Sequence, residues 1–322
     1  MPSPYGTIVD NPEFHAAMFA EKLDRALRVD DREKAMRLIT SVSNKQRQMM
    51  CEPYRIKYGK DLIASLAKKF SGDSENLVMA LMETPLDYDV KQLKQATKGI
   101  GTDETALIEI LCPRTTQQMA AIRLRYEQEY KKSLEQDVVE DTSGEFRRIL
   151  SSLISGVRDD DDHTDDQRAR EDAARLYSND EGKLTPKSDP DYFHHVVLTS
   201  NQHQLKKMCD AYAELSGMNI EKQIEKEFSG DVRNAYLTIV RLAANRQKYF
   251  ATQLYGCMSG PGTRDNDLIR TLVTRSEVDL ELIKEEFREL YGDVLDRIVK
   301  NDTSGLYRDG LLAIVKGNRN DM

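Results

Sequence analysis

The chain has 322 residues, 39% of them apolar and 32% charged, with a formal net charge of −8 at pH 7. This predicts a globular protein whose core is divided among several units. The negative charge argues against nucleic acid as a partner, because neutralised phosphates supply most of the affinity in such complexes. We expect a cytoplasmic protein, since no stretch reaches the roughly 18 apolar residues of a membrane span and the first residues do not resemble a signal peptide. Four cysteines without a Cys-x-x-Cys pair predict free thiols.

One sequence pattern recurs four times along the chain. Its most regular mark is a Ser-Gly pair, whose glycines are Gly72, Gly144, Gly230 and Gly305, at spacings of 72, 86 and 75 residues. Repetition at such a period indicates that each unit packs on its neighbours to bury a shared core. The predicted organisation is a short tail (1–13), repeat 1 (14–86), repeat 2 (87–158), an acidic linker (159–170), repeat 3 (171–245) and repeat 4 (246–322).

Apolar residues recur with a helical period in every repeat, and no stretch alternates as a strand would. In repeat 2 the pattern predicts five helices, within residues 90–97, 103–111, 115–130, 133–141 and 143–154. Thr102 is the expected N-cap of the second of these helices. The predicted fold is therefore all-α, with four repeats of five helices each.

Two repeats carry Gly-x-Gly-Thr between the first and second predicted helices, at 99–102 and 260–263. The loop at 99–102 does not match a dinucleotide-binding Gly-x-Gly-x-x-Gly motif, because Glu104 occupies the place of the third glycine. Neither loop has the Gly-Lys-Ser/Thr of a P-loop, so nucleotide binding is not expected. Each loop is instead followed by an acid at a fixed distance: Gly101 precedes Asp141 by 40 residues, and Gly262 precedes Asp302 by 40.

The repeated spacing predicts two calcium sites. Glycine lets successive carbonyl oxygens turn toward one point, and calcium prefers carbonyl and carboxylate oxygens. With one full charge per site, affinity should be modest and coordination positions should stay open to a lipid phosphate oxygen. The alternative is an ordinary helix start and an ordinary break between two helices. The expected ligands are the carbonyls of Thr97, Gly99 and Gly101 with the carboxylate of Asp141, and the carbonyls of Met258, Gly260 and Gly262 with the carboxylate of Asp302.

The four repeats, the loops KGIGTDE and GPGT, the acid 40 residues beyond each loop, and the sequences DVVEDTSGEFRRIL, LVTRSEVDL and NDTSG together resemble the annexin family. The resemblance runs from about Tyr5 to the C-terminus. It implies a slightly curved disk with calcium loops on its convex face. It also implies a non-enzymatic protein that docks on acidic, phosphatidylserine-like membranes from the cytosolic side when calcium rises, and it leaves self-association on the membrane open.

Repeats 1 and 3 depart from the family pattern. Residues 25–36 of repeat 1 contain no glycine and Lys69 stands at the acid position, so we expect no calcium site there. Repeat 3 keeps an acid, but a lysine replaces the second glycine of its loop, and the pattern leaves calcium binding open. The repeat 3 site would consist of the carbonyls of Gly182, Thr185 and Lys187 with the carboxylate of Glu227.

Several other side chains have both a functional and a structural interpretation. Lys98, Ile100 and Arg264 lie in or beside the two loops and are candidates for contact with lipid, with a solvated side chain as the alternative. We expect the channel positions to form ion pairs that hold the two halves together rather than to conduct ions. The positions that match the annexin central channel are Asp89, Glu109, Arg114 and Arg270.

A rival hypothesis from another class is a calcium-independent helical scaffold that binds protein partners. Release by a chelator would discriminate between the two hypotheses. Catalysis has no support in the sequence, because His194 and His195 are neighbours that point to different sides of a predicted helix and no local nucleophile motif is present.

Overall fold

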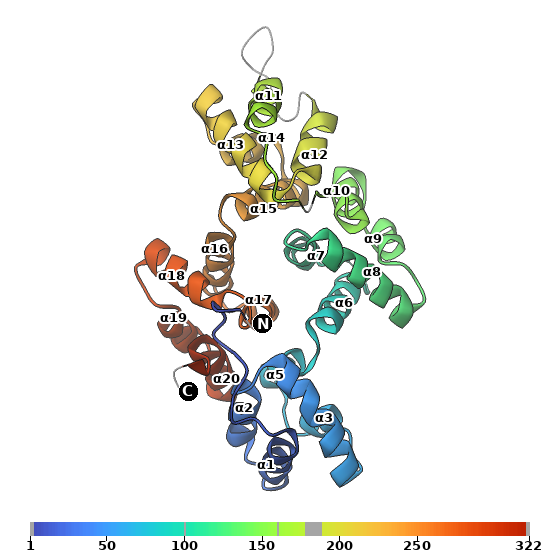
Figure 1. Ribbon diagram of the computed structural model, residues 1–322, viewed down its shortest axis with the longest axis vertical. Coiled ribbons are helices and arrows are strands. Elements are labelled where there is room, and N and C mark those ends of the chain that lie inside the picture. The colour runs from blue at the N-terminus through green and yellow to red at the C-terminus, as the bar shows by residue number, and fades with distance from the viewer. Residues whose placement is uncertain (1–2, 100, 160, 178–188, 320–322) are drawn as a thin grey trace. The chain divides into compact units, whose positions relative to one another are not determined.

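The computed structural model describes residues 3–99, 101–159, 161–177 and 189–319. They form two compact units, one of residues 1–88 with 250–322 and one of residues 89–249. Helices are the regular elements of the described residues, which contain no β-strand, so the predicted all-α fold is confirmed (Figure 1). None of these helices is long and apolar enough to cross a membrane.

The described residues of each repeat form five helices, as the periodicity predicted. Repeat 1 contains α1 (Ala16–Arg28), α2 (Arg32–Thr40), α3 (Asn44–Tyr58), α4 (Leu62–Ala67) and α5 (Gly72–Met82). Repeat 2 contains α6 (Pro85–Ala96), α7 (Glu104–Leu111), α8 (Thr116–Tyr130), α9 (Leu134–Asp141) and α10 (Gly144–Ser155). Repeat 3 contains α11 (Asp166–Tyr177), which begins within the predicted linker, followed by α12 (Pro190–Thr199), α13 (Gln202–Ser216), α14 (Ile220–Glu227) and α15 (Gly230–Ala244). Repeat 4 contains α16 (Arg246–Met258), α17 (Asp265–Arg275), α18 (Leu280–Tyr291), α19 (Leu295–Asp302) and α20 (Gly305–Lys316).

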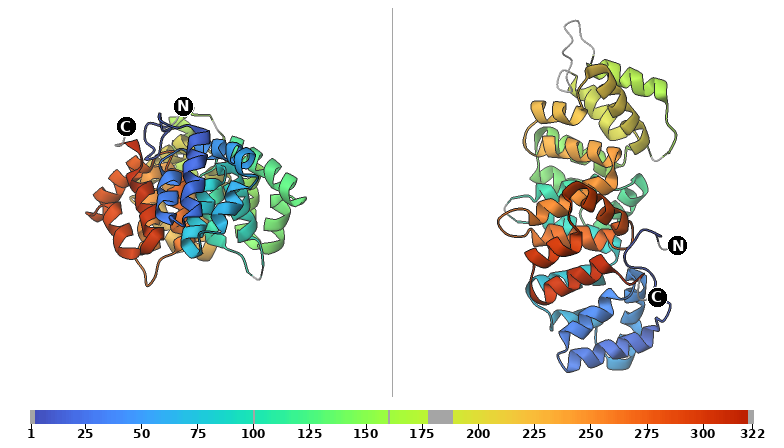
Figure 2. Two further views of the ribbon diagram at one scale, coloured as in Figure 1. Left: turned by 90° about the horizontal axis from the view of Figure 1, so that it is seen from below. Right: turned by 90° about the vertical axis from the view of Figure 1, so that its left-hand side faces the viewer.

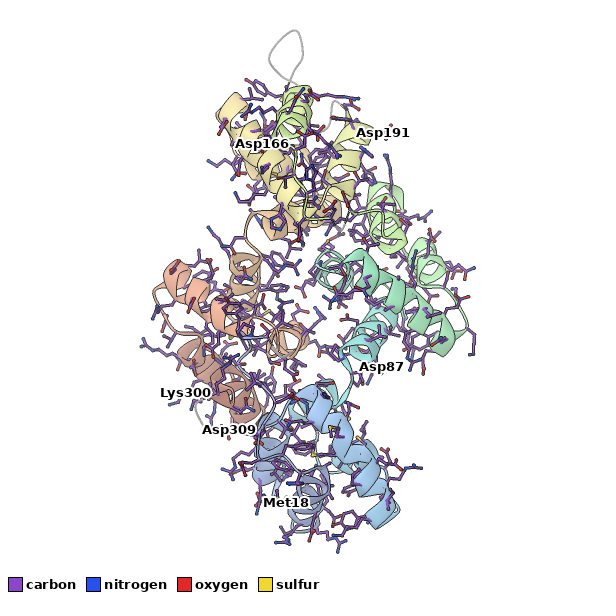
Figure 3. The ribbon with its side chains drawn as sticks, in the orientation of Figure 1. Met18, Asp87, Asp166, Asp191, Lys300 and Asp309 are labelled. Atoms are coloured by element: carbon purple, nitrogen blue, oxygen red, sulfur yellow. The ribbon has the colours of Figure 1, made fainter. Side chains whose placement is uncertain are left out.

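Local signals set many of the helix ends. Capping boxes begin α3 at Ser43, α8 at Thr115 and α9 at Ser133, each satisfying backbone N–H groups that have no partner inside the helix. The acid Asp87, labelled in Figure 3, lies in the first turn of α6, where the helix dipole favours negative charge. The prediction that Thr102 caps α7 is wrong: Asp103 is the N-cap and accepts from the Ala106 N–H at 2.9 Å.

In the first unit, α20 packs on α2 and α5, and α17 packs on α5. The contact of α20 is close because Gly310 has no side chain: a Cβ there would lie 2.8 Å from the Met36 sulfur and 2.7 Å from Leu77 Cδ2. Burial raises the pKa of Asp265 at the start of α17, and the carboxylate of Asp73 at the start of α5 raises it further. The starts of α5 and α17 therefore lie close together in this unit.

The N-terminal segment joins the two repeats of the first unit. The hydroxyl of the buried Thr7 donates to the Ile314 carbonyl at 2.7 Å, and Asn318 exchanges hydrogen bonds with the backbone of Val9. Gly317 has a φ of 69°, and a Cβ there would lie 1.9 Å from the Thr7 carbonyl oxygen, so only glycine fits this crossing.

In the second unit, α15 packs on α7, α10 and α13, and α13 packs extensively on α11. Near the start of α12, the exposed Asp191 labelled in Figure 3 pairs with Arg148 of α10 at 2.5 Å. In the acidic stretch before α11, the side chains of Asp159 and Asp161 accept hydrogen bonds from backbone N–H groups two residues further on. Such bonds are typical of turn-forming aspartates.

Candidate metal-binding loops

The repeat 2 loop connects α6 to α7. Its glycines have left-handed backbone conformations, with φ of 109° at Gly99 and 94° at Gly101, which residues with side chains rarely adopt. The Asp103 N–H closes the loop by donating to the Ala96 carbonyl at 2.9 Å. The loop is therefore a defined turn whose shape depends on both glycines.

The repeat 4 loop connects α16 to α17 and is closed by an equivalent backbone hydrogen bond, although only one of its two glycines, Gly262, has a left-handed conformation. The Arg264 N–H donates to the Cys257 carbonyl at 3.0 Å, the counterpart of the bond that closes the repeat 2 loop, and Gly262 has a φ of 91°. Figure 2 shows this loop projecting beyond the ends of the helices that it connects. Its exposed backbone is accessible to a ligand from solvent.

In repeats 2 and 4, a threonine of the loop forms hydrogen bonds with the predicted acid. The Thr102 hydroxyl donates to the backbone carbonyl of Asp141 at 3.1 Å. The Thr263 hydroxyl donates both to the Asp302 carbonyl at 3.2 Å and to its carboxylate at 2.6 Å. The two halves of each candidate site thus meet although they are about 40 residues apart in sequence.

The residues present fit a hard cation such as calcium. The backbone hydrogen bonds described around the repeat 2 loop end on the carbonyls of Leu93, Gln95 and Ala96, and those of Thr97, Gly99 and Gly101 accept none of them. The described residues contain no cluster of three or more His, Cys, Asp or Glu side chains that could hold a metal. In the loops of repeats 2 and 4, the candidate donors for a cation are mainly neutral carbonyl oxygens with a single carboxylate, a donor set that suits calcium rather than zinc.

Repeat 1 is built differently at this place. Helix α1 continues to Arg28, and the Val29 and Asp30 N–H groups donate to the carbonyls of Arg25 and Leu27. The carbonyls at the positions that would face a cation thus accept hydrogen bonds at the end of α1. Lys69, at the acid position, pairs with Asp30 at 3.3 Å and places an ammonium group beside this turn. That repeat 1 has no calcium site of this type remains a prediction.

Several predicted site residues cannot be placed. Ile100, Gly182, Thr185 and Lys187 lie outside the described residues. Glu227, the acid of repeat 3, is half-buried at the end of α14 and accepts a hydrogen bond from the Gln223 side-chain amide.

Two of the three candidates for lipid contact are among the described residues, and their contact with lipid remains a prediction. Lys98 is exposed in the repeat 2 loop. Arg264 is exposed at the end of the repeat 4 loop, where its guanidinium lies 3.6 Å from the Asp267 carboxylate and donates to the Cys257 sulfur at 3.7 Å.

Two of the channel positions form an ion pair within the second unit. The Arg114 guanidinium binds both carboxylate oxygens of the buried Asp89, at 2.6 and 2.7 Å. Glu109 is half-buried in α7 of the same unit. In the first unit, the buried Arg270 pairs with Asp267 at 2.5 Å. The proposal that these residues hold the two halves of the protein together remains a prediction.

The two histidines of α12 behave as their neighbouring positions predicted. His194 is buried, and its ring lies 3.0 Å from the Ser152 hydroxyl and 3.2 Å from both Glu145 and the Tyr236 hydroxyl. Burial is the main cause that lowers the pKa of His194. Ser152 lies inside α10, where backbone N–H groups are used by the helix and cannot stabilise an oxyanion. We interpret the group as a structural network, since His195 is not part of it.

A buried polar cluster that joins α6, α8 and α9 in repeat 2 was missed by the sequence analysis. Asp137 of α9 is 5% exposed and pairs with Lys94 at 2.7 Å and with Lys132 at 2.6 Å. It also accepts from the Tyr126 hydroxyl at 2.5 Å. A possible signal was an acid four residues before Asp141 on the same helix, but such an acid is equally typical of a solvated first turn.

The fold and the loops together define a class of helical proteins with four five-helix repeats, in which the loops of repeats 2 and 4 are suited to a hard cation. A sequence model of the Annexin family matches residues 18–81, 88–153, 171–239 and 249–314, and the chain belongs to the annexin family. It is 40% identical over 315 residues to Annexin A6 of Gallus gallus, covering 97% of this chain but 47% of that relative. The chain thus spans about half the length of this relative.

Solved structures agree with this family membership. The structure of annexin III matches with a TM-score of 0.93 and 38% identity, covering 98% of both chains. A crystal structure of calcium-bound annexin (Sm)1 matches with a TM-score of 0.84 and 29% identity, covering 96% of this chain and 92% of the other.

Proposed function

We propose that this protein binds acidic phospholipid membranes reversibly and in a calcium-dependent manner, with calcium bridging the loops of repeats 2 and 4 to lipid phosphate. The observation that carries the proposal is the double occurrence of one construction: a glycine loop closed by the same backbone bond and joined through a threonine to one acid. Membership of the annexin family, known for calcium-dependent phospholipid binding, and the calcium bound to annexin (Sm)1 support it.

A bridging cation resolves the electrostatic problem of this protein. With a net charge of −8, the chain as a whole is repelled by an anionic bilayer. A calcium ion held by three carbonyls and one carboxylate keeps net positive charge and, because calcium takes six to eight oxygens, retains positions for phosphate oxygens. Binding should therefore follow the calcium concentration and reverse when calcium is removed. In a cell this places the protein in the cytoplasm at rest and on the cytosolic face of membranes when calcium rises.

The test is co-sedimentation with phosphatidylserine liposomes across a calcium titration, followed by chelator. The Asp141→Ala, Asp302→Ala variant should need a much higher calcium concentration than the unmodified protein. A matched control is Glu135→Ala, Asp296→Ala, which removes the same charge from the first turns of the same two helices, α9 and α19. The control variant should sediment at the same calcium concentration as the unmodified protein.

The outcomes separate the proposal from its rivals. If the Asp141→Ala, Asp302→Ala variant sediments like the control, the loops of repeats 2 and 4 are not the calcium sites. If the protein binds liposomes or partners without calcium and chelator does not release it, the calcium-independent scaffold is the better description. The proposed binding requires no catalytic step, so we assign no catalytic residue.

A further inference from the structure

The buried cluster around Asp137 links the helix that leads into the repeat 2 loop to the helix that ends in the predicted acid. Lys94 is one helical turn before Thr97, the first residue of the loop, and Asp137 is one turn before Asp141, the predicted ligand. Residues four apart on a helix lie on the same face. Asp137 and Lys94 thus connect the turn of α9 that ends in the acid to the turn of α6 that leads into the loop.

The cluster has the properties of a rigid connection. The Asp137 carboxylate receives hydrogen bonds from two ammonium groups and one phenol, contributed by α6, α8 and the α8–α9 connection. Burial disfavours the charged form, but the hydrogen bonds from Lys132, Lys94 and Tyr126 outweigh it and lower the pKa of Asp137 to about 2. The carboxylate therefore stays ionised at neutral pH, and its charge-assisted bonds are of the strong kind.

Repeat 4 has no such cluster at the corresponding positions. A shift of 161 residues relates Thr97 to Met258 and Asp141 to Asp302, and places Tyr255, Phe287 and Ile298 where repeat 2 has Lys94, Tyr126 and Asp137. Here the Tyr255 ring stacks on Tyr291 at 3.8 Å between centroids, and Tyr291 packs on Phe287 at 5.0 Å. An apolar and aromatic contact thus replaces the ionic one.

The two sites also differ in how the loop holds its acid. Thr263 donates directly to the carboxylate of Asp302, whereas Thr102 reaches the backbone carbonyl of Asp141. The side chain of Asp141 is exposed and receives less support from its own loop. Its position depends correspondingly more on the helix that carries it.

We propose that Asp137 is a positioning residue for the repeat 2 calcium site, which acts through α9 and α6 to hold the Asp141 carboxylate at the distance from the loop carbonyls that the cation requires. This inference rests on the proposed function. It predicts that loss of Asp137 weakens calcium binding in repeat 2 and leaves repeat 4 unchanged. Groups that orient metal ligands typically change metal affinity by roughly 10–100-fold when they are removed.

The experiment places Asp137→Asn in two backgrounds, Asp302→Ala, which keeps the repeat 2 acid, and Asp141→Ala, which keeps the repeat 4 acid. Calcium binding is measured by isothermal titration calorimetry and by co-sedimentation with phosphatidylserine liposomes. In the Asp302→Ala background we expect the half-saturating calcium concentration to rise by roughly tenfold. In the Asp141→Ala background it should not change.

A second variant keeps the test valid if Asp137→Asn fails to fold, which thermal unfolding in chelator will reveal. Lys94→Met leaves Asp137 paired with Lys132 and Tyr126, and should shift calcium binding in the same background by a smaller factor. Equal shifts in both backgrounds, or no shift in either, would overturn the positioning role. If neither single-acid background responds to calcium while Asp137 is intact, the proposed function itself fails, and the positioning role fails with it.

Discussion

The Thr263 hydroxyl lies 2.6 Å from the Asp302 carboxylate, whereas the equivalent Thr102 hydroxyl lies 3.1 Å from the backbone carbonyl of Asp141. The same sequence position therefore orients a candidate ligand in repeat 4 and supports only the backbone in repeat 2. A carboxylate has about four lone-pair sites, so one donated hydrogen bond fixes its orientation and leaves oxygens for a cation.

We expect Thr263→Val to weaken calcium binding in repeat 4 more than Thr102→Val weakens it in repeat 2. Valine keeps the shape of threonine and removes the hydroxyl, so the difference reports on the hydrogen bond to the carboxylate. A bond to a charged group contributes about 1.5–3 kcal/mol, which corresponds to at least about a tenfold change in calcium affinity if it is realised in full. Calcium titrations measure the two effects, with Thr263→Val made in the Asp141→Ala background and Thr102→Val made in the Asp302→Ala background. Tighter calcium binding by Thr263→Val would contradict this and would mean that the hydroxyl competes with the cation.

Repeat 1 should not gain a calcium site when its acid position is restored. In Lys69→Glu the ammonium group is replaced by a carboxylate, but α1 still continues to Arg28 and the carbonyls of Arg25 and Leu27 still accept backbone hydrogen bonds. The number of calcium ions bound per chain, measured by titration calorimetry, should therefore be the same in Lys69→Glu as in the unmodified protein. An increase of one ion per chain would show that charge, and not backbone geometry, excludes calcium from repeat 1.

Local sequence signals were sufficient to predict the helices and the glycine loops of repeats 2 and 4. Helical periodicity and capping residues act within a few positions, and the left-handed conformations at Gly99, Gly101 and Gly262 are those that glycine adopts at little cost. The N-cap of α7 was misassigned because Thr102 and Asp103 are both capping residue types. The choice between them depends on the contact of Thr102 with the Asp141 carbonyl, 39 residues away.

The Asp137 cluster was not predictable from the sequence for the same reason. In the sequence SLEQDVVED, an acid near the start of a short helix is typical of a solvated side chain that interacts with the helix dipole. Its burial is decided by Lys94, which lies 43 residues earlier, and by Tyr126 of another helix. Tertiary contacts of this kind override the local preference of a charged residue for solvent.

Asp137 should stabilise the fold in a pH-dependent manner. Its pKa in the folded protein is about 2, below the ordinary value of 3.8, so its stabilising effect is fully present above pH 4 and is lost as the pH falls toward 2. The difference in pKa corresponds to about 2 kcal/mol. We expect Asp137→Asn to lower the free energy of unfolding by about this amount at pH 7. Urea unfolding in chelator at several pH values checks this, and a gap between the two proteins that stays constant from pH 7 to pH 2 would contradict it.

The pair of Arg47 and Glu277 joins repeats 1 and 4 at 2.7 Å, with Arg47 1% exposed. Burial lowers the pKa of Arg47 to about 10, and burial also raises the pKa of Glu277. Both directions mean that burial of the charges opposes the gain from their attraction, so the pair contributes little net stability while each member requires the other.

Arg47→Met alone should therefore lower the free energy of unfolding by about 3–5 kcal/mol at neutral pH, because it leaves the Glu277 carboxylate unpaired. Adding Glu277→Gln should recover much of this loss, since glutamine keeps an oxygen that can accept the Asn44 N–H and carries no charge. The cost of Arg47→Met should also shrink as the pH falls, because protonation neutralises Glu277. Urea unfolding of the two single variants and the double variant measures these differences. Additive losses in the double variant would show that the two side chains act independently and that their pairing is not what makes each removal costly.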